Sequence, residues 1–303
     1  MDNSKVYCIV VTYNGMKWID RCLGSLRRSN IRLETVVIDN GSIDGTIQRL
    51  EQFYGEIKVV KNASNLGFGA ANNIGIRIAL ADDAEFVFLL NQDAWIEPDT
   101  LTKLVSAARE SPEFGIVSPI HLRGDARNLD RQFSMYISPP YSDFFNDLYC
   151  SSLAKIYPCG FINAAAWLLS RRCIEIVGLF EPLFFIYGED SNYVQRLKFH
   201  KLLMGLVPAA KIVHDRAERK GSKNKIGSEL EVSTFLYVKL MNIKGSLMSN
   251  IAQSFKVFVK FGFNARTIRN FALALVKIPS MRARVNMHRK HSYLLERPNG
   301  YSH

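Results

Sequence analysis

The residues best suited to chemistry follow an apolar segment near the centre of the first half of the chain. The run Phe86–Leu90 stops at Asn91, Gln92 and Asp93. Such a run is typical of a strand buried on both faces, and open α/β sheets bind ligands beyond the carboxyl ends of their strands. Asp93 could therefore hold a divalent cation against a phosphate. The alternative is an ordinary turn before a helix at Pro98, because Asn and Asp commonly end strands.

Three other expected strands also end in polar residues. They are Thr12 and Asn14 after the first strand, Asp39, Ser42 and Asp44 after the second, and Asn65, Gly67 and Asn72 after the third. The carboxyl ends of parallel strands meet at one edge of a sheet, so these residues should converge on one crevice. The glycine-rich segment that contains Gly67 suits close approach of the backbone to a ligand. Each segment alone is an ordinary turn signal.

A second polar cluster follows the aromatic segment Phe184–Tyr187. Glu189 and Asp190 stand there side by side, and a carboxylate beside apolar walls tends to have the raised pKa that suits a general base. Acids are also favoured in the first turn of a helix, which is the structural alternative. His214 follows a short strand expected at 209–213 and is a candidate metal ligand, although a lone His is more often structural.

The elements that must position these residues alternate along the chain. The strand candidates are Val6–Thr12, Glu34–Asp39, Ile57–Val60, Phe86–Leu90 and Gly115–Val117, and the helix candidates lie near 16–29, 44–53, 69–81 and 98–110. This alternation predicts an α/β fold with a mostly parallel central sheet and flanking helices. Residues 121–158 are irregular and rich in aromatic side chains, which suit sugar rings or packing under a long loop. We expect 216–228 to be a mobile loop.

The last third of the chain differs in charge. Residues 1–210 contain 21 Lys and Arg against 23 Asp and Glu, whereas residues 211–303 contain 18 against 5. Apolar residues at helical spacing between 251 and 276 are flanked by basic ones, as in helices that lie on anionic bilayers. We expect Pro279 to end the last of these helices. Packing of the apolar faces on the rest of the chain or on a second subunit is the alternative, and no nucleic acid is expected.

Composition sets broad limits on class and compartment. The hydrophobic content of 48% and the charged content of 22% are values typical of globular proteins. Five widely spaced cysteines show no metal or disulfide pattern, which favours a reducing compartment such as cytoplasm. We expect neither a signal peptide nor a membrane-spanning segment, because the sequence shows no apolar run long enough to span a bilayer.

The ordered motifs resemble a known family. Val10-Val-Thr-Tyr-Asn14, Val37-Ile-Asp-Asn-Gly-Ser-Ile-Asp-Gly-Thr46, Asn65-Leu-Gly-Phe-Gly-Ala-Ala-Asn72, Leu89-Leu-Asn-Gln-Asp93 and Phe185-Ile-Tyr-Gly-Glu-Asp190 occur in this order. Together they resemble the inverting family 2 glycosyltransferases of GT-A fold, in particular the bacterial rhamnosyltransferase-like branch. The resemblance covers about residues 5–216, and each motif alone is weak.

The resemblance implies a role for each candidate residue. Nucleotide-sugar binding is implied for Thr12, Asn14, Asp39, Ser42, Asp44, Asn65, Gly67, Asn72, Asn91 and Gln92. Asp93 and His214 would bind Mg²⁺ or Mn²⁺ on the diphosphate. Asp190 would be the catalytic base with Glu189 beside it, and Arg196 would reach phosphate or fix the acids. Three departures bear on these roles, namely Asn91 in place of the first acid of Asp-x-Asp, Glu181 in place of an Asp, and Lys201 in place of a Gly.

These implications define the expected protein. Residues 1–228 would form a GT-A catalytic domain, with the nucleotide-sugar half at about 1–120 and the acceptor half at about 121–228, and residues 229–303 a basic helical extension. The enzyme would move a sugar from a nucleotide diphosphate-sugar (dTDP-rhamnose or a UDP-hexose) to a saccharide acceptor, lipid-linked in the favoured case, for cell-surface polysaccharide. It would be cytoplasmic and peripheral on the inner face of the membrane, with a homo-oligomer left open.

Two rivals remain at this point. A nicotinamide-dependent oxidoreductase would have a similar sheet, but Gly67-Phe-Gly-Ala-Ala-Asn72 lacks the third Gly of the dinucleotide fingerprint and follows the third strand. A non-catalytic, membrane-associated nucleotide-sugar-binding module would keep the pocket residues without needing Asp190.

Overall fold

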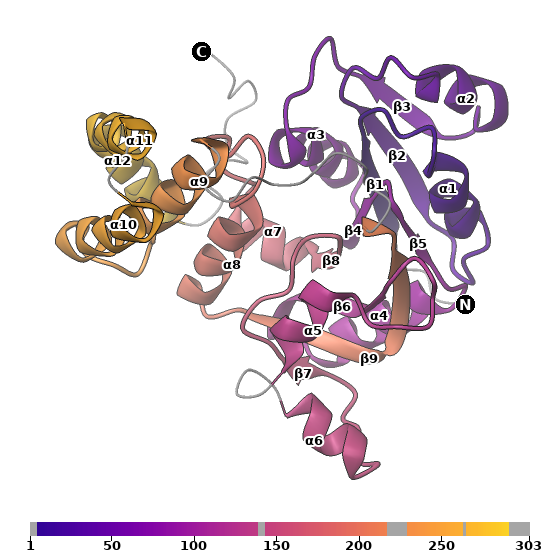
Figure 1. The fold of residues 1–303 in the computed structure, drawn as a ribbon. Helices are drawn as coiled ribbons and strands as arrows, with labels where there is room; N and C mark the ends of the chain where they lie inside the picture. The colour runs from indigo at the N-terminus through magenta and orange to yellow at the C-terminus, as the bar shows by residue number, and fades with distance from the viewer. Residues whose placement is uncertain (1–4, 139–142, 217–228, 263–264, 291–303) are drawn as a thin grey trace.

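The computed structural model describes residues 5–138, 143–216, 229–262 and 265–290 (Figure 1). Within these residues nine strands form one sheet in the order β3-β2-β1-β4-β8-β6-β9-β5, with β7 beside β9. The strands are β1 Val6–Thr12, β2 Glu34–Asp39, β3 Lys58–Lys61, β4 Phe86–Asn91, β5 Ala94–Ile96, β6 Phe114–Leu122, β7 Tyr157–Pro158, β8 Ala166–Ser170 and β9 Leu203–His214. Helices flank this sheet, which confirms the predicted α/β class.

The N-terminal half of the sheet is parallel. β1 pairs in parallel with β2 and β4, and β2 pairs in parallel with β3. The intervening helices are α1 Ile19–Arg27, α2 Thr46–Phe53 and α3 Phe68–Ala81, and α4 Thr100–Glu110 follows β5. Strand-helix-strand units of this length place the carboxyl ends of β1, β2, β3 and β4 on one edge. The predicted elements of this half are confirmed within a few residues at their ends.

The second half departs from a purely parallel sheet. β8 lies antiparallel between β4 and β6, and β9 runs parallel to β6. β6 is longer than the predicted Gly115–Val117, because it continues through Pro119 with a register shift at Pro119/Ile120. A Pro that cannot donate to the ladder is tolerated at such an irregularity. The sequence pattern stops at that Pro and therefore predicts too short a strand.

Apolar side chains cover both faces of the sheet. One buried cluster contains Ile9, Val36, Leu89 and Trp167, and the other contains Val10, Val37, Phe88 and Leu168. Alternate residues of a strand point to opposite faces, so continuous apolar runs give two cores. The remaining helices beside this sheet are α5 Arg131–Ile137, α6 Phe144–Tyr149, α7 Arg171–Val177 and α8 Glu189–Phe199.

Four helices follow at the C-terminal side and lie beside α8 in Figure 1: α9 Glu229–Leu240, α10 Leu247–Phe261, α11 Ala265–Val276 and α12 Ile278–His288. They share a small core that includes Phe184. α11 ends before Pro279, as expected, and Pro279 lies in the first turn of α12. Among the described residues, no helix is long and apolar enough to cross a membrane. The domain boundary at residue 228 stays a prediction, and the expected mobile loop lies outside the described residues after Arg216.

Candidate functional site

A cavity of about 780 Å³ lies beyond the carboxyl ends of β1, β2 and β4. We call it the main cavity. Of the predicted site residues, its lining includes Asn65, Gly67, Asn91, Gln92, Asp93, Glu189 and Asp190. Both polar clusters of the sequence therefore meet in one space. The remaining predicted residues lie outside the lining: Thr12, Asn14, Asp39, Ser42, Asp44, Asn72, Arg196 and His214.

Gln92 links the ends of β1 and β4. Its Oε1 accepts hydrogen bonds from Thr12 Oγ1 at 2.7 Å and from the Tyr13 amide at 3.0 Å. Its Nε2 donates to the Tyr13 carbonyl at 3.2 Å. Thr12 is buried by this contact, and Tyr13 is left facing the cavity. These bonds hold the backbone of Tyr13, whose 45% exposed aromatic side chain is suited to contact with a nucleobase or a sugar ring.

The loop after β2 is organised by its own carboxylates. Asp39 is buried, and its Oδ2 accepts from the amides of Gly41 and Ser42 at 2.9 and 3.0 Å. The Asn14 amide donates to Ser42 Oγ at 2.8 Å. Asp44 accepts from the Met16 amide at 3.0 Å. Asp39 and Asp44 thus stabilise the conformation of this loop and do not line the main cavity. A ligand could be bound only by the carboxylate lone pairs that the loop amides leave free.

Asn40 is a cavity residue that the sequence analysis missed. Its Nδ2 donates to Asn65 Oδ1 at 3.2 Å and to the Gly67 carbonyl at 3.3 Å. It thereby holds the loop after β3 against the end of β2. The sequence feature that could have identified Asn40 is its position directly after Asp39, at the end of β2.

Asn72, a predicted site residue, is 1% exposed inside α3 and donates to the Phe68 carbonyl.

Gly67 brings the glycine-rich loop against the acidic segment. Its φ is +82°, and a Cβ at this position would lie 1.9 Å from the carbonyl oxygen of Phe185. Glycine is required here for both reasons. The contact sets the loop after β3 beside the aromatic segment that leads into Glu189 and Asp190.

Asp93 and His214 form a buried pair. Asp93 lies in the turn between β4 and β5, and β5 pairs with β9 so that Ala94 lies opposite His214. His214 Nε2 is 3.4 Å from Asp93 Oδ1 and 3.4 Å from Asn91 Nδ2, and Asp93 and His214 are each 1% exposed. Asp93 is thus both a turn residue and a carboxylate at the cavity.

The pair could contribute two metal ligands. No group of three or more His, Cys, Asp or Glu suited to a metal ion occurs among the described residues. Mg²⁺ is commonly held by one or two carboxylates with substrate phosphates and water completing the shell, so Asp93 with a bound diphosphate fits that pattern. Asn91 supplies only a neutral amide where a second carboxylate would strengthen the site.

Arg216 is a second cavity residue that the sequence analysis missed. Its Nε donates to His214 Nδ1 at 3.2 Å and lies 3.6 Å from Asp130 Oδ2, and its guanidinium also contacts Gln132. In this arrangement His214 accepts at Nδ1, so its proton is on Nε2. Ligation of a metal through Nε2 therefore requires the proton to move to Nδ1 and Arg216 to turn away.

Glu189 and Asp190 form the first turn of α8. Burial and the charge of Asp190 raise the pKa of Glu189 to about 8. Burial also raises the pKa of Asp190, and hydrogen bonds from the Ser191 and Ala164 amides and the charge of Arg216 oppose this rise. Hydrogen bonds and the charge of Arg216 favour the ionised form at Asp190, whereas a pKa of about 8 favours the protonated form of Glu189 at neutral pH. An ionised Asp190 at a helix N-terminus is a candidate general base.

Two buried oxygens face the cavity without a hydrogen-bond partner among the described residues. They are Glu189 Oε2 and Asn163 Oδ1, and both residues line the main cavity. Buried polar atoms are usually paired, so these two are candidates for contact with a ligand. Asn163 was also missed, and nothing in its sequence context marks it.

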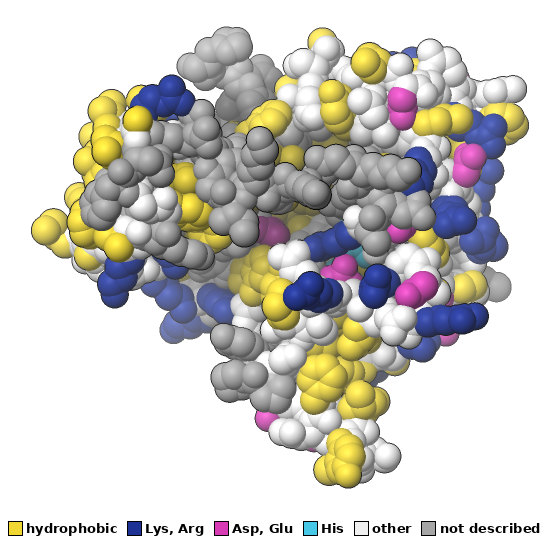
Figure 2. Space-filling view, in the orientation of Figure 1, with side chains coloured by type: hydrophobic (Ala, Val, Ile, Leu, Met, Phe, Trp, Pro, Cys, Tyr) yellow, Lys and Arg dark blue, Asp and Glu magenta, His cyan; other side chains and the backbone are white. Residues whose placement is uncertain are grey.

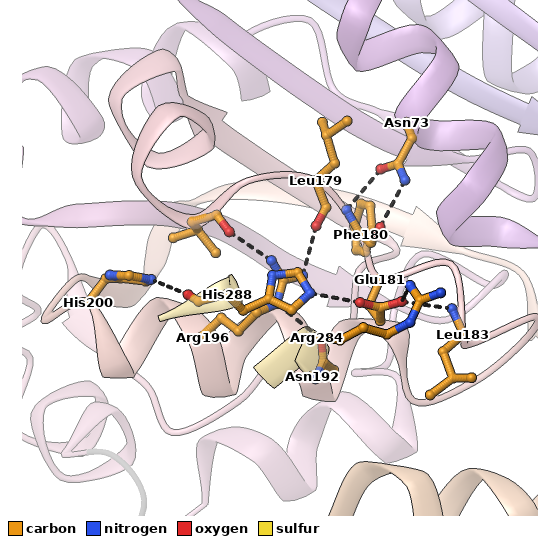
Figure 3. A network of polar contacts seen from close by, with 11 residues as sticks. Asn73, Leu179, Phe180, Glu181, Leu183, Asn192, Arg196, His200, Arg284 and His288 are labelled. Carbon is orange, nitrogen blue, oxygen red and sulfur yellow. Dashed lines mark hydrogen bonds and ion pairs between the residues drawn. The ribbon is translucent and has the colours of Figure 1, made fainter. Parts of the chain in front are cut away.

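Arg196 lies outside the lining of the main cavity. It is 1% exposed, and its guanidinium donates to the carbonyls of Val177 and Leu179 at 2.7 and 2.8 Å and to Asn192 Oδ1 at 3.0 Å (Figure 3). Its donors are thus turned toward the loop before the acidic segment. In this arrangement the guanidinium binds protein oxygens away from the main cavity, because a buried guanidinium must satisfy its donors where it lies. The two predicted roles, reaching a phosphate or fixing the acids, stay predictions.

Glu181, at the second departure from the family pattern, anchors α12. It is fully buried, and it accepts from Arg284 Nη1 at 2.7 Å and faces His288 Nε2 at 2.7 Å (Figure 3). Burial lowers the pKa of His288 to about 4. Burial opposes ionisation of Glu181 too, but the hydrogen bond from His288 and the charge of Arg284 outweigh it and lower the pKa of Glu181. A neutral His288 therefore donates to an ionised Glu181, which joins the C-terminal helices to the segment before Glu189.

α9 forms one wall of the main cavity. Thr234, Phe235 and Val238 line it. The Gly188 cap of α8 has a φ of +88°, and a Cβ there would lie 2.7 Å from Thr234 Cγ2. The predicted helical extension thus contributes directly to the site.

The chain is similar to several known proteins. A family model described as Glycosyl transferase family 2 matches residues 7–165. The chain is 27% identical over 238 residues to an N-acetylglucosaminyl-diphospho-decaprenol L-rhamnosyltransferase of Mycobacterium tuberculosis, covering 70% of this chain and 76% of that protein. It is 24% identical over 216 residues to the dTDP-rhamnosyl transferase RfbF of Shigella flexneri, covering 70% and 69%.

Solved structures show the same fold. TarS 1–349 of S. aureus, in complex with UDP-GlcNAc, matches with a TM-score of 0.59 at 15% identity, covering 93% of this chain and 83% of that one. The mannosyltransferase PcManGT of Pyrobaculum calidifontis, in complex with GDP-Man and Mn²⁺, matches with a TM-score of 0.57 at 18% identity, covering 97% and 86%. At these identities the likeness concerns the fold, which is that of GT-A enzymes.

Proposed function

Because this chain belongs to glycosyl transferase family 2, and is therefore a glycosyltransferase that uses a nucleotide sugar, we propose that it transfers rhamnose from dTDP-rhamnose, or a hexose from a UDP-hexose, to a saccharide acceptor. The observation that carries the proposal is the main cavity, in which the strand-end residues and the Glu189–Asp190 pair face one space. The alternative of a non-catalytic binding module is disfavoured by the family.

The reaction proposed is a single displacement that inverts the anomeric centre. Asp190 takes the proton of the acceptor hydroxyl as that oxygen attacks the anomeric carbon and the nucleoside diphosphate leaves. Glu189, protonated at neutral pH, can donate a hydrogen bond without competing for that proton. Asn163 and Tyr13 orient the substrates. No enzyme nucleophile is required.

The residues proposed to face the donor diphosphate include one good ligand for a divalent cation and two poor ones. Asp93 would hold Mg²⁺ or Mn²⁺, which supplies positive charge to the leaving diphosphate. His214 would join only after Arg216 turns away, and Asn91 adds no charge. Arg216 lines the cavity and offers its own positive charge to the same phosphates. We therefore propose cation binding that is weak without a bound nucleotide sugar.

The proposed acceptor is a lipid-linked saccharide. The Mycobacterium tuberculosis relative is named for a decaprenol-diphosphate-linked acceptor, and the similarity to it covers 70% of this chain. An enzyme acting on such acceptors in cell-surface polysaccharide synthesis would work at the inner face of the membrane.

We further propose that the C-terminal helices α9 to α12 attach to an anionic membrane surface; the end of the predicted extension, 291–303, lies outside the described residues. α10 and α11 bury polar side chains (Asn250, Ser254, Thr267 and Asn270) and expose apolar ones (Met248, Phe255, Val259, Ile268, Leu273 and Val276). Figure 2 shows hydrophobic side chains gathered on the part of the molecule formed by these helices. Apolar side chains exposed beside one another on these helices are expected of a surface that meets lipid or another apolar face.

The transfer experiment uses the whole chain. A thermal-shift screen of dTDP- and UDP-sugars identifies the donor, since a ligand of the folded state raises the melting temperature. Transfer is then measured with and without Mn²⁺, and inverted product stereochemistry by NMR is the expected result. Nucleotide binding without any turnover in the wild type would overturn the proposal.

The membrane experiment is separate. Flotation with vesicles containing phosphatidylglycerol should recover the wild type, and Leu273→Ser/Val276→Ser should reduce the recovered fraction. Sedimentation of the lipid-free protein as a dimer, which the same substitutions dissociate, would instead assign the apolar face to a homo-oligomer.

A further inference from the structure

A second cavity adjoins the main one along α9. It measures about 530 Å³ and is lined by Phe235, Lys239, Gln253, Lys256, Val257 and Phe261. We call it the helical cavity. Phe235 lines both cavities, and Lys239 follows it by one helical turn on the same face of α9. The two spaces therefore meet at Phe235, in the wall that faces the candidate base.

The helical cavity combines aromatic walls with two cations. Phe235 and Phe261 pack with ring centroids 5.7 Å apart. Among the described residues, Lys239 and Lys256 have no ion-pair partner. The sequence from 232 to 290 contains eleven Lys and Arg and not one Asp or Glu. The acids of α9, Glu229 and Glu231, stand near the start of that helix, whereas Lys239 stands in its last turn. The described lining of the helical cavity thus contains two lysines and no acid, which favours an anionic ligand.

The surface beyond the helical cavity is apolar. Phe255 and Val259 on α10 are each 50% exposed, and they stand on either side of Lys256 in the sequence. An exposed apolar row next to two lysines suits a ligand with an anionic head and a hydrocarbon chain. A free sugar phosphate could bind the two lysines but would make no contact with the exposed apolar side chains of Phe255 and Val259.

We propose that the helical cavity binds the diphosphate of a lipid-linked acceptor. Lys239 and Lys256 hold the diphosphate, the attached sugar extends past Phe235 to Asp190, and the hydrocarbon chain leaves over the exposed face of α10. This inference rests on the proposed lipid-linked acceptor. It goes further by assigning acceptor recognition to the C-terminal helices, so that the candidate donor and acceptor sites lie on opposite sides of the acidic pair.

The test is direct binding, which does not depend on turnover. Farnesyl diphosphate is titrated calorimetrically into the wild type, Lys239→Gln/Lys256→Gln, and the control Lys244→Gln/Lys290→Gln. The control removes two charges from exposed positions of the same C-terminal region outside both cavities. We expect the first variant to lose about 10- to 100-fold in affinity and the control to bind as the wild type does. Melting temperatures establish that both variants fold.

Three outcomes would overturn the inference. Equal losses in both variants, or no binding by the wild type, would exclude a defined diphosphate site. Equally tight binding of dihexanoyl phosphatidylglycerol would assign the cavity to a phospholipid headgroup instead. Donor binding and transfer to an alkyl glycoside, which lacks a diphosphate, should be unchanged in the lysine variants. Failure of that transfer in the wild type would count against the proposed function and leave the binding result to stand.

Discussion

Gly67 touches the backbone of Phe185, and this contact joins the two halves of the site. A Cβ on Gly67 would lie 1.9 Å from the Phe185 carbonyl oxygen, at a φ of +82°. The loop after β3 and the segment leading to Asp190 are therefore packed without space for a side chain. This contact fixes the position of the loop after β3, which contains Asn65, relative to the segment that carries Glu189 and Asp190.

Gly67→Ala should accordingly destabilise the fold and weaken nucleotide binding together. Backbone strain at such a φ costs about 1–3 kcal/mol, and the overlap with Phe185 adds to it. Gly45→Ala is the matched control, because Gly45 has a φ of +91° and a Cβ there would meet nothing within 4 Å. Chemical denaturation and donor titration of both variants measure the difference. Equal losses in the two variants would contradict a special role for the Phe185 contact.

Asp190→Asn should reduce turnover by about 10²–10⁴-fold, the usual contribution of a general base. The donor should still bind, because the substitution keeps the shape of the side chain. Glu189→Gln is the control, since Gln resembles the protonated Glu189 present at neutral pH, and it should retain most activity near pH 7. Rates and donor affinities of both variants decide the roles. The reverse ranking would make Glu189 the base.

The raised pKa of Glu189 predicts a pH dependence of stability. Burial brings this pKa to about 8 in the folded protein, against 4.5 for an ordinary Glu. Between these values the folded state holds a proton that the unfolded state has released, so stability falls as the pH rises. Between pH 5 and pH 8 the melting temperature of the wild type should therefore fall by more than that of Glu189→Gln. Parallel melting curves of the two proteins across that range would contradict this assignment.

Asp93→Asn should remove most of the Mg²⁺ or Mn²⁺ dependence along with activity. The carboxylate is the one charged oxygen ligand offered to the cation by the Asp93–His214 pair, and losing such electrostatic stabilisation costs about 10²–10³-fold in rate. His214→Gln should cost less, because Arg216 still lines the cavity and can offer its charge to a bound diphosphate. Cation titrations of the initial rate measure both effects. Activity that neither chelator nor Asp93→Asn reduces would exclude the proposed metal role.

The Glu181–His288 contact predicts that acid weakens the docking of α12. The pKa of His288 is lowered from 6.5 to about 4, and the pKa of Glu181 lies below 4.5. The unfolded or undocked segment therefore binds more protons between pH 6.5 and 4, and stability falls as the pH falls through this window. Limited proteolysis of the C-terminal helices should accelerate toward pH 4. Glu181→Gln should show faster cleavage already at pH 7, and His288→Gln should flatten the pH dependence.

Sequence alone determined the class of the fold, the family and six of the polar residues that line the main cavity. Apolar runs that end in polar residues make strand ends recognisable, because burial on both faces demands continuous hydrophobic residues. Thus Asn91, Gln92 and Asp93, as well as Glu189 and Asp190, were identified from the order of residues. The topology rule that gathers parallel strand ends then predicted one crevice.

Tertiary structure alone decided which side chains face the cavity and which support it. Asp39 turned out to hold its own loop, Arg196 to bind backbone carbonyls, and Arg216 and Asn163 to face the cavity. The wall formed by α9 also could not be predicted, because it depends on how a distant helix docks on Gly188. Local patterns record the period and the ends of elements, whereas side-chain direction and long-range docking depend on contacts between residues far apart in the chain.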